Sequence, residues 1–90
     1  MPMNARERLA WNLRALRVAQ GLSQERLAAD AGIDRAYVGG IERQTENPTI
    51  DLLDRLATTL HVDLAALLAL PAEGETPPAP LRGGRPRRVS

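Results

Sequence analysis

The chain contains no cysteine, no lysine and no phenylalanine. Without cysteine it can form neither a disulfide framework nor a thiolate metal site. It has one Trp and one Tyr, so its hydrophobic content of 43% must pack mainly as Leu, Ile, Val and Ala. That composition suits packed helices better than a sheet. All twelve basic residues are Arg, which we attribute to genome composition and which decides nothing about partners.

Residues that commonly carry catalysis are also scarce. His61 is the only histidine, Ser23 and Ser90 are the only serines, and Ser23 is needed as a helix cap. The acidic residues form no paired cluster, and there is no glycine-rich phosphate loop. An enzyme is therefore the least favoured class of function, and we expect no cofactor, no metal and no small-molecule ligand.

Long hydrophobic runs are missing as well. The longest apolar stretch, LAALLAL, is far too short to span a bilayer, and we expect no signal peptide. At 90 residues the chain supports one small domain. We expect a cytoplasmic protein with no membrane partner.

The net charge of +1 is unevenly distributed. Residues 1–22 hold four Arg and one Glu, a balance of +3, and residues 44–70 hold four acidic residues and one Arg, a balance of −3. The last twenty residues hold four Arg and two Glu, a balance of +2. This distribution suits a protein with one DNA-facing side, although solvated faces can produce the same pattern.

A helix, a tight turn and a second helix are predicted for residues 23–43. Ser23 and Asp34 are N-cap residues. Gly32 stands where the first helix ends, because glycine tolerates the left-handed conformation there. The apolar face continues through both helices at Leu27, Ala28, Ala31, Ile33, Val38 and Ile41. Such a unit can place side chains in a DNA major groove, although a helical hairpin in any small bundle shares the pattern.

Three more helices and a tail complete the predicted layout. The first helix runs from about residue 5 to residue 20, with Asn4 as its cap and Glu7 completing a capping box. Its buried stripe is Leu9, Leu13 and Leu16, and Gly21 ends it. Trp11 lies outside that stripe, either at the surface or covered by the tail or a partner.

The second half of the chain continues the helical pattern. Pro48 disfavours helix before it, and Thr49 caps a fourth helix that buries Leu52, Leu53, Leu56 and Leu60. Asp63 is predicted to cap a short fifth helix that Pro71 stops. The predicted domain covers residues 4–70. Residues 71–90, rich in Pro, Gly and Arg, are predicted to be a disordered tail.

Three segments, NLRALRVAQGLSQ, YVGGIER and NPTIDLLDRLATTLHV, resemble the XRE family of helix-turn-helix regulators, the Cro and C1 repressor type. The resemblance begins at about Leu9 and covers about two-thirds of the chain. It implies an all-α, five-helix bundle of the lambda repressor-like type that binds operator DNA as a dimer. YVGGIER and the NP segment also resemble restriction–modification controller proteins, and many other XRE regulators.

The resemblance implies roles for exposed positions of the helix-turn-helix. Arg35 and Ala36 begin the recognition helix and meet base edges. Arg35 can donate two hydrogen bonds to guanine, and Ala36 can offer only a methyl contact to thymine. Gln24 matches a position that grips a phosphate beside free helix amides, and Arg43 and Asn47 match positions near the sugar-phosphate backbone. Solvated side chains are the alternative for Arg35 and Gln24.

Other matched positions lie partly inside the fold. Arg17 and Glu42 match an internal ion pair, and Tyr37 matches a partly packed residue whose hydroxyl touches phosphate. Gly39 and Gly40 weaken the helix by about 1 kcal/mol each relative to Ala; a close approach to DNA explains them, with drift as the alternative. The predicted DNA-binding set is Gln24, Asp34, Arg35, Ala36, Tyr37, Gly39, Gly40, Arg43 and Asn47.

Three positions depart from the family's pattern. Gly40 stands where a base-reading side chain is common, so direct readout is expected to be absent there. Gln44 replaces the Gly that commonly closes the recognition helix. Glu46 stands where a basic residue often faces phosphate, and we expect it to weaken DNA affinity slightly.

A second DNA contact is predicted in the tail. Gly84-Arg85-Pro86 resembles an AT-hook, whose extended Arg-Pro core lies in a narrow A·T minor groove. Narrow grooves concentrate negative potential that attracts Arg. A generic charged tail is the alternative. The predicted tail contacts are Arg82, Arg85, Arg87 and Arg88.

The expected partners are double-stranded DNA and a second copy of the chain. One recognition helix covers too few base pairs for selective binding in a genome. The predicted dimer interface is Leu64, Leu67, Leu68 and Leu70, of which Leu67 and Leu70 are expected to be the more exposed. The expected function is a transcription regulator that binds a palindromic operator as a homodimer at the nucleoid. The alternative is an antitoxin-type protein-binding module that regulates its own operon.

Overall fold

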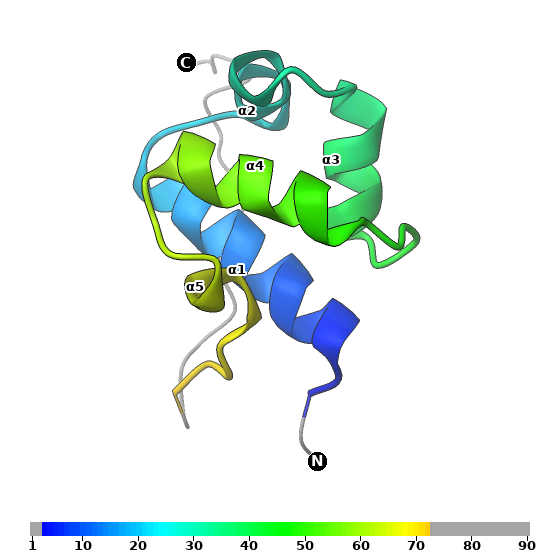
Figure 1. The fold of residues 1–90 in the computed structure, drawn as a ribbon, viewed down its shortest axis with the longest axis vertical. Helices are drawn as coiled ribbons and strands as arrows, with labels where there is room; N and C mark the ends of the chain where they lie inside the picture. Colours follow the sequence, from blue (N-terminus) through cyan, green and yellow to red (C-terminus); the bar gives the residue numbers. More distant parts are fainter. Residues whose placement is uncertain (1–2, 73–90) are drawn as a thin grey trace, which may run out of the picture.

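The computed structural model describes residues 3–72 of the chain. Five helices follow one another, with no strand in this part of the chain (Figure 1). They are α1 (Ala5–Ala19), α2 (Gln24–Ala31), α3 (Arg35–Glu42), α4 (Ile50–Leu60) and α5 (Ala65–Leu68). The predicted all-α, five-helix fold is confirmed. The predicted tail contacts, Arg82, Arg85, Arg87 and Arg88, lie outside the described residues.

The first four helices begin at side-chain caps. The Asn4 side chain accepts a hydrogen bond from the Glu7 backbone N–H at 2.9 Å, and the Glu7 carboxylate accepts one from the Asn4 N–H at 2.8 Å. The Ser23 and Thr49 hydroxyls each accept from the backbone N–H three residues further on. The Asp34 carboxylate accepts from the Ala36 N–H at the start of α3 over a longer distance of 3.4 Å. These four predicted caps are confirmed.

The same four helices end in left-handed residues, with two closing backbone hydrogen bonds each. Glycine is favoured at such positions because it has no Cβ to clash. Gly21 and Gly32 end α1 and α2, at φ angles of 70° and 73°. Gln44 and His61 end α3 and α4 at 66° and 60°. The third and fourth helices therefore end without the residue that this geometry favours.

The fifth helix differs from its prediction at both ends. Its N-cap position is Leu64, which makes no side-chain cap, so the predicted Asp63 cap is wrong. It ends at Leu68, and the extended Ala69 follows before Pro71 is reached. A helix of one turn has few hydrogen bonds of its own, and a side chain of α1 supplies further ones. The Asn12 amide donates to the backbone carbonyls of Leu67 and Ala69 at 3.1 and 2.7 Å.

One hydrophobic core joins all five helices. α1 packs against α3 and α5, α2 packs against α3 and α4, and α4 also contacts α5. In Figure 1, α2 and α3 lie at one end of the molecule and α5 lies toward the other. Burial of each large aliphatic side chain contributes about 1.5–3 kcal/mol. The core residues are Leu9, Leu13, Leu27, Ala28, Ala31, Val38, Ile41, Leu53, Leu56, Ala57, Leu60 and Leu67.

The leucines around α5 do not divide as predicted. Leu67 is completely buried, so its predicted exposure is wrong, whereas Leu70 is 54% exposed as expected. Leu64 and Leu68 are half-buried and pack against the edge of the core. A single helical turn has one side directed fully inward, and Leu67 occupies it. The apolar surface near α5 is therefore smaller than the sequence suggests.

Candidate nucleic-acid interface

The exposed stripe of α3 begins at its first turn. Arg35 and Ala36 are exposed, and Tyr37 is half-buried against the core. Residues four apart on a helix lie above one another, so Gly39 and Gly40 continue the stripe of Arg35 and Ala36. α3 thus presents one cationic side chain at its beginning and two glycines in its middle.

The end of α3 is held by a buried carboxylate. The Glu42 side chain is 0% exposed and accepts hydrogen bonds from Arg17 Nε at 2.7 Å and Arg17 Nη2 at 2.9 Å. Arg14 Nε donates to the same carboxylate at 3.2 Å, and Gln24 Nε2 donates at 3.1 Å. Arg17 also donates to the Leu22 carbonyl at 2.8 Å. One carboxylate therefore joins α1, α2 and α3.

The environment of Glu42 acts on its pKa in two directions. Burial of the carboxylate raises the pKa. The hydrogen bonds from Arg17 and Gln24, the positive charge of Arg17 and the hydrogen bond from Arg14 lower it. The second group of effects prevails, so the pKa of Glu42 lies below its ordinary value. The carboxylate is ionised at neutral pH and compensates the buried charge of Arg17.

The same contact orients Gln24 at the beginning of α2. Only the amide NH2 can donate to Glu42, so the hydrogen bond determines which way the amide points. Gln24 Oε1 lies 3.4 Å from the position where residue 39 would carry a Cβ. The second N–H of the side-chain amide therefore remains available for the predicted phosphate contact of Gln24.

Two side chains lie over the glycines of α3. Arg43 Nη1 is 2.9 Å from the position of a Cβ at Gly39, and Glu46 Cγ is 2.5 Å from that at Gly40. Both glycines are buried beneath these groups. Side chains from later in the chain therefore occupy the space over both glycines in this conformation, and the approach of their backbone to DNA stays a prediction.

Hydrogen bonds hold the loop after α3 to α3 itself and to α1. The Gly40 carbonyl accepts from the Thr45 backbone N–H at 2.8 Å and from the Thr45 hydroxyl at 3.2 Å. Arg6 Nε of α1 donates to the Glu46 carbonyl at 3.3 Å. Asn47 follows in this loop and is exposed, as a contact with the DNA backbone requires.

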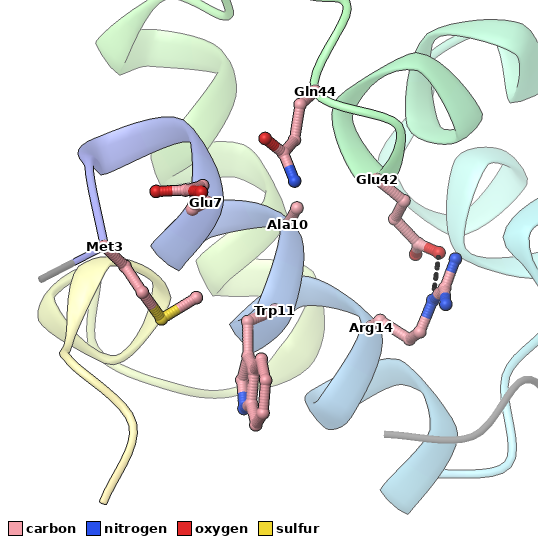
Figure 2. A pocket seen from close by; sticks show the side chains of 7 residues that line it. All are labelled: Met3, Glu7, Ala10, Trp11, Arg14, Glu42 and Gln44. Carbon is pink, nitrogen blue, oxygen red and sulfur yellow. Dashed lines mark hydrogen bonds and ion pairs between the residues drawn. The ribbon is translucent and has the colours of Figure 1, made fainter. Parts of the chain in front are cut away.

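A small pocket of about 200 Å³ opens beside the buried ion pair (Figure 2). Arg14 reaches toward Glu42 at one side of it, and Met3 lies at the other with Trp11 between them. Pockets for small organic ligands usually have about 300–1,000 Å³, so this one is small for such a ligand. Its lining residues are Met3, Glu7, Ala10, Trp11, Arg14, Glu42 and Gln44.

Two further features of the described part of the chain bear on function. Residues 3–72 contain no group of three or more His, Cys, Asp or Glu side chains placed to hold a metal ion. Within the same range, none of the helices combines the length and apolar character that a membrane span needs.

Sequence reasoning missed three features of this site. Arg14 joins the predicted Arg17–Glu42 pair, and Gln24 turns its amide toward the same carboxylate. The covering of both glycines was also unforeseen. The spacing of Arg14 and Arg17 on one helical face could have indicated the first feature, but the others depend on side-chain directions in the folded chain.

Comparison with known proteins agrees with this geometry. The helix-turn-helix family model HTH_3 matches residues 13–67. A hypothetical transcription factor of Neisseria meningitidis is 42% identical over 65 residues, 72% of this chain and 61% of that protein, so the match spans less than two thirds of its length. The control protein C.SmaI of Serratia marcescens is 41% identical over 66 residues, 73% of this chain and 79% of that protein.

Crystal structures give the same result. The restriction–modification controller C.AhdI of Aeromonas hydrophila has a TM-score of 0.67 at 44% identity, covering 69% of this chain and 94% of that one. The controller C.Esp1396I, as a tetramer with its natural 35 base-pair operator, has a TM-score of 0.66 at 29% identity, covering 72% and 86%. The chain therefore belongs to the XRE-type helix-turn-helix family, and within it is similar to the restriction–modification controller proteins.

Proposed function

We propose that the protein is a sequence-specific DNA-binding transcription regulator whose α3 enters the major groove. The observation that carries this proposal is the pairing of an exposed first turn with a buried last turn in α3. Arg35 is free to meet a base, while Glu42 holds the helix against α1 and α2. Preorganised side chains on a rigid element are what base readout requires.

Six of the predicted DNA-binding residues have a defined role in this proposal. Arg35 donates to guanine, Ala36 lies against a thymine methyl, and Asp34 sets the start of the helix. Tyr37 and Asn47 reach the sugar-phosphate backbone, and the second N–H of Gln24 does the same from the N-terminus of α2. Phosphate contacts fix the register of the protein, and base contacts select the sequence.

The relatives support a regulator over the other classes. They are described as a transcription factor and as control proteins, and one controller structure contains operator DNA. None of these descriptions names a toxin or an enzymatic activity, which favours the regulator over an antitoxin-type module or an enzyme. A protein acting in this way works at the nucleoid in the cytoplasm.

A homodimer on a palindromic operator completes the proposal. Two recognition helices double the readout and place half-sites about 34–36 Å apart. The exposed Leu70 and the half-buried Leu64 and Leu68 offer apolar surface for the second copy. Leu67 belongs to the core and supports this surface from beneath. In sedimentation, Leu70→Glu should give folded monomers, whereas Leu67→Glu should prevent folding.

The basic tail is proposed as an additional DNA-binding segment on the grounds of its sequence. Removal of residues 81–90 takes away Arg82, Arg85, Arg87 and Arg88. If these residues neutralise phosphates, the slope of log affinity against log salt becomes shallower by about 0.9 for each phosphate that is no longer neutralised. An unchanged slope would remove the tail from the mechanism.

A selection from random double-stranded DNA tests the proposed function. The full chain should enrich an inverted repeat whose half-sites lie about one helical turn apart. Binding to the enriched sequence should exceed binding to unrelated DNA by about 10³-fold or more at physiological salt. Recovery of random sequences only would contradict the proposal. For Arg35→Ala, which removes an arginine from the proposed DNA-binding surface, the charge-matched control is Arg55→Ala, which removes an exposed arginine from α4.

A further inference from the structure

We propose that the side chain of Arg43 makes a base contact at the level of Gly39 on the recognition helix. Its guanidinium curls back over α3 and reads a guanine in the major groove. This proposal rests on the proposed function, because it requires α3 to lie in that groove. In this proposal the base contact replaces the sugar-phosphate contact that the sequence predicts for Arg43. Gly39 has no side chain and so leaves space for the Arg43 guanidinium.

The positions along α3 carry the first step of the argument. Gly39 is four residues after Arg35, and Arg43 is four residues after Gly39, so all three share one helical face. Side chains on a helix point back toward its N-terminus. Arg43 follows this rule, since its Nη1 atom lies 2.9 Å from the position of a Cβ at Gly39. Its guanidinium therefore lies at the middle of the stripe that begins with Arg35.

The guanidinium of Arg43 is available to a ligand. Among residues 3–72 no carboxylate forms an ion pair with it, in contrast to Arg14, Arg17 and Arg26. Arg43 is exposed although the glycine beneath it is buried. A free guanidinium on the outer face of α3 has the donor geometry that matches O6 and N7 of guanine.

Gln24 lies near the same glycine. Glu42 accepts from Gln24 Nε2, and Gln24 Oε1 lies 3.4 Å from the same Cβ position over Gly39. The amide oxygen of Gln24 and the guanidinium of Arg43 therefore both lie near Gly39. The hydrogen bond to the buried Glu42 holds Gln24 on the side of α3 where Arg43 lies.

Glycine at position 39 is required by this arrangement. A methyl group there would meet Arg43 Nη1 at 2.9 Å, a distance that real Cβ contacts essentially never show. Because that atom is the far end of a flexible side chain, Gly39→Ala displaces the guanidinium without disturbing the fold. Arg55→Ala is the control, because it removes an exposed arginine from α4, outside the proposed DNA-binding surface.

The experiment is a binding-site selection with the full chain, repeated for Arg43→Ala, Gly39→Ala and Arg55→Ala. The unaltered chain should prefer guanine at one inner position of each half-site by about 5- to 150-fold, the range expected for a bidentate contact. Arg43→Ala and Gly39→Ala should both lose the preference at that position and keep it elsewhere. Arg55→Ala should keep the preference at that position.

Other outcomes would overturn the inference. If Arg43→Ala keeps the selected sequence, binds all DNA more weakly and shows a shallower salt dependence, then Arg43 contacts phosphate. If Gly39→Ala keeps the guanine preference, the space over Gly39 has no role in placing the Arg43 guanidinium. Failure of the unaltered chain to select any sequence would instead contradict the proposed function, and the inference with it. Thermal melts verify that each variant is folded, with Arg43→Gln as a second variant should Arg43→Ala unfold.

Discussion

The two ends of α3 are built in opposite ways. At its first turn the only side-chain cap is a long hydrogen bond of 3.4 Å to the Asp34 carboxylate. Arg35, in the same turn, makes no ion pair within residues 3–72. Its last turn is buried, and Glu42 there receives four hydrogen bonds from three side chains. Within one eight-residue helix, the part proposed to meet DNA is separate from the part that stabilises the fold.

Removal of the buried carboxylate should have the largest effect on this comparison. Glu42→Ala leaves the charge of Arg17 buried without a partner, which typically costs about 3–5 kcal/mol. Urea denaturation should show this loss in the free energy of unfolding. Asp54→Ala, which removes an exposed carboxylate from α4, should change it by less than about 0.5 kcal/mol. A decrease below about 1 kcal/mol for Glu42→Ala would show that the last turn does not depend on the ion pair.

Acid should weaken the last turn in the same way. The pKa of Glu42 is lower in the folded chain than in the unfolded one, so its ionised form stabilises the fold at neutral pH. That contribution should decline as the pH falls below the unfolded value of about 4.3 and through the lower folded value. Denaturation curves at several pH values should show a steeper acid loss for the unaltered chain than for Glu42→Gln. Equal slopes would contradict the pKa shift.

Substitution in the first turn should affect binding without affecting stability. Arg35→Ala removes an exposed side chain with no ion pair in the described residues, so the free energy of unfolding should change by less than about 0.5 kcal/mol. Discrimination at one base pair of each half-site should fall by about 1–3 kcal/mol. Titrations with single-base variants of the selected operator measure this. A comparable loss of folding stability would show that the two ends are not separate.

A smaller effect is expected just beyond the last turn. Gln44 occupies the left-handed conformation that glycine adopts more easily. Gln44→Gly should therefore stabilise the protein by about 1 kcal/mol. Ala29→Gly, which places a glycine at an exposed position within α2, should destabilise it by about the same amount. A loss of stability in Gln44→Gly would indicate that the Gln44 side chain contributes more than its backbone conformation costs.

Helix beginnings could be predicted because caps are local. Asn4, Ser23, Asp34 and Thr49 each act on a backbone group two or three residues away, so the sequence alone contains both partners. The capless start of α5 was not predictable, because its stability comes from Asn12, more than fifty residues earlier in the chain. Residues that act across the fold leave no local signal.

The site shows the same division. The Arg17–Glu42 pair followed from a family resemblance, whereas the turn of Arg43 over Gly39 depends on a side-chain direction that no sequence pattern contains. The burial of Leu67 was missed for a related reason, since several leucines close together in the chain do not reveal which of them faces the core. Side-chain direction and long-range packing account for both.

In the proposed dimer, α1 connects the contact near α5 to the recognition helix. Its Asn12 holds the carbonyls at the end of α5, and its Arg17, little more than one turn later, is bound to the end of α3. A single helix thus spans from the proposed dimer contact to the recognition helix. Because α1 is a rigid helix, it then fixes the separation of the two recognition helices in the proposed dimer. An operator with one extra base pair between its half-sites would have to twist to fit the protein.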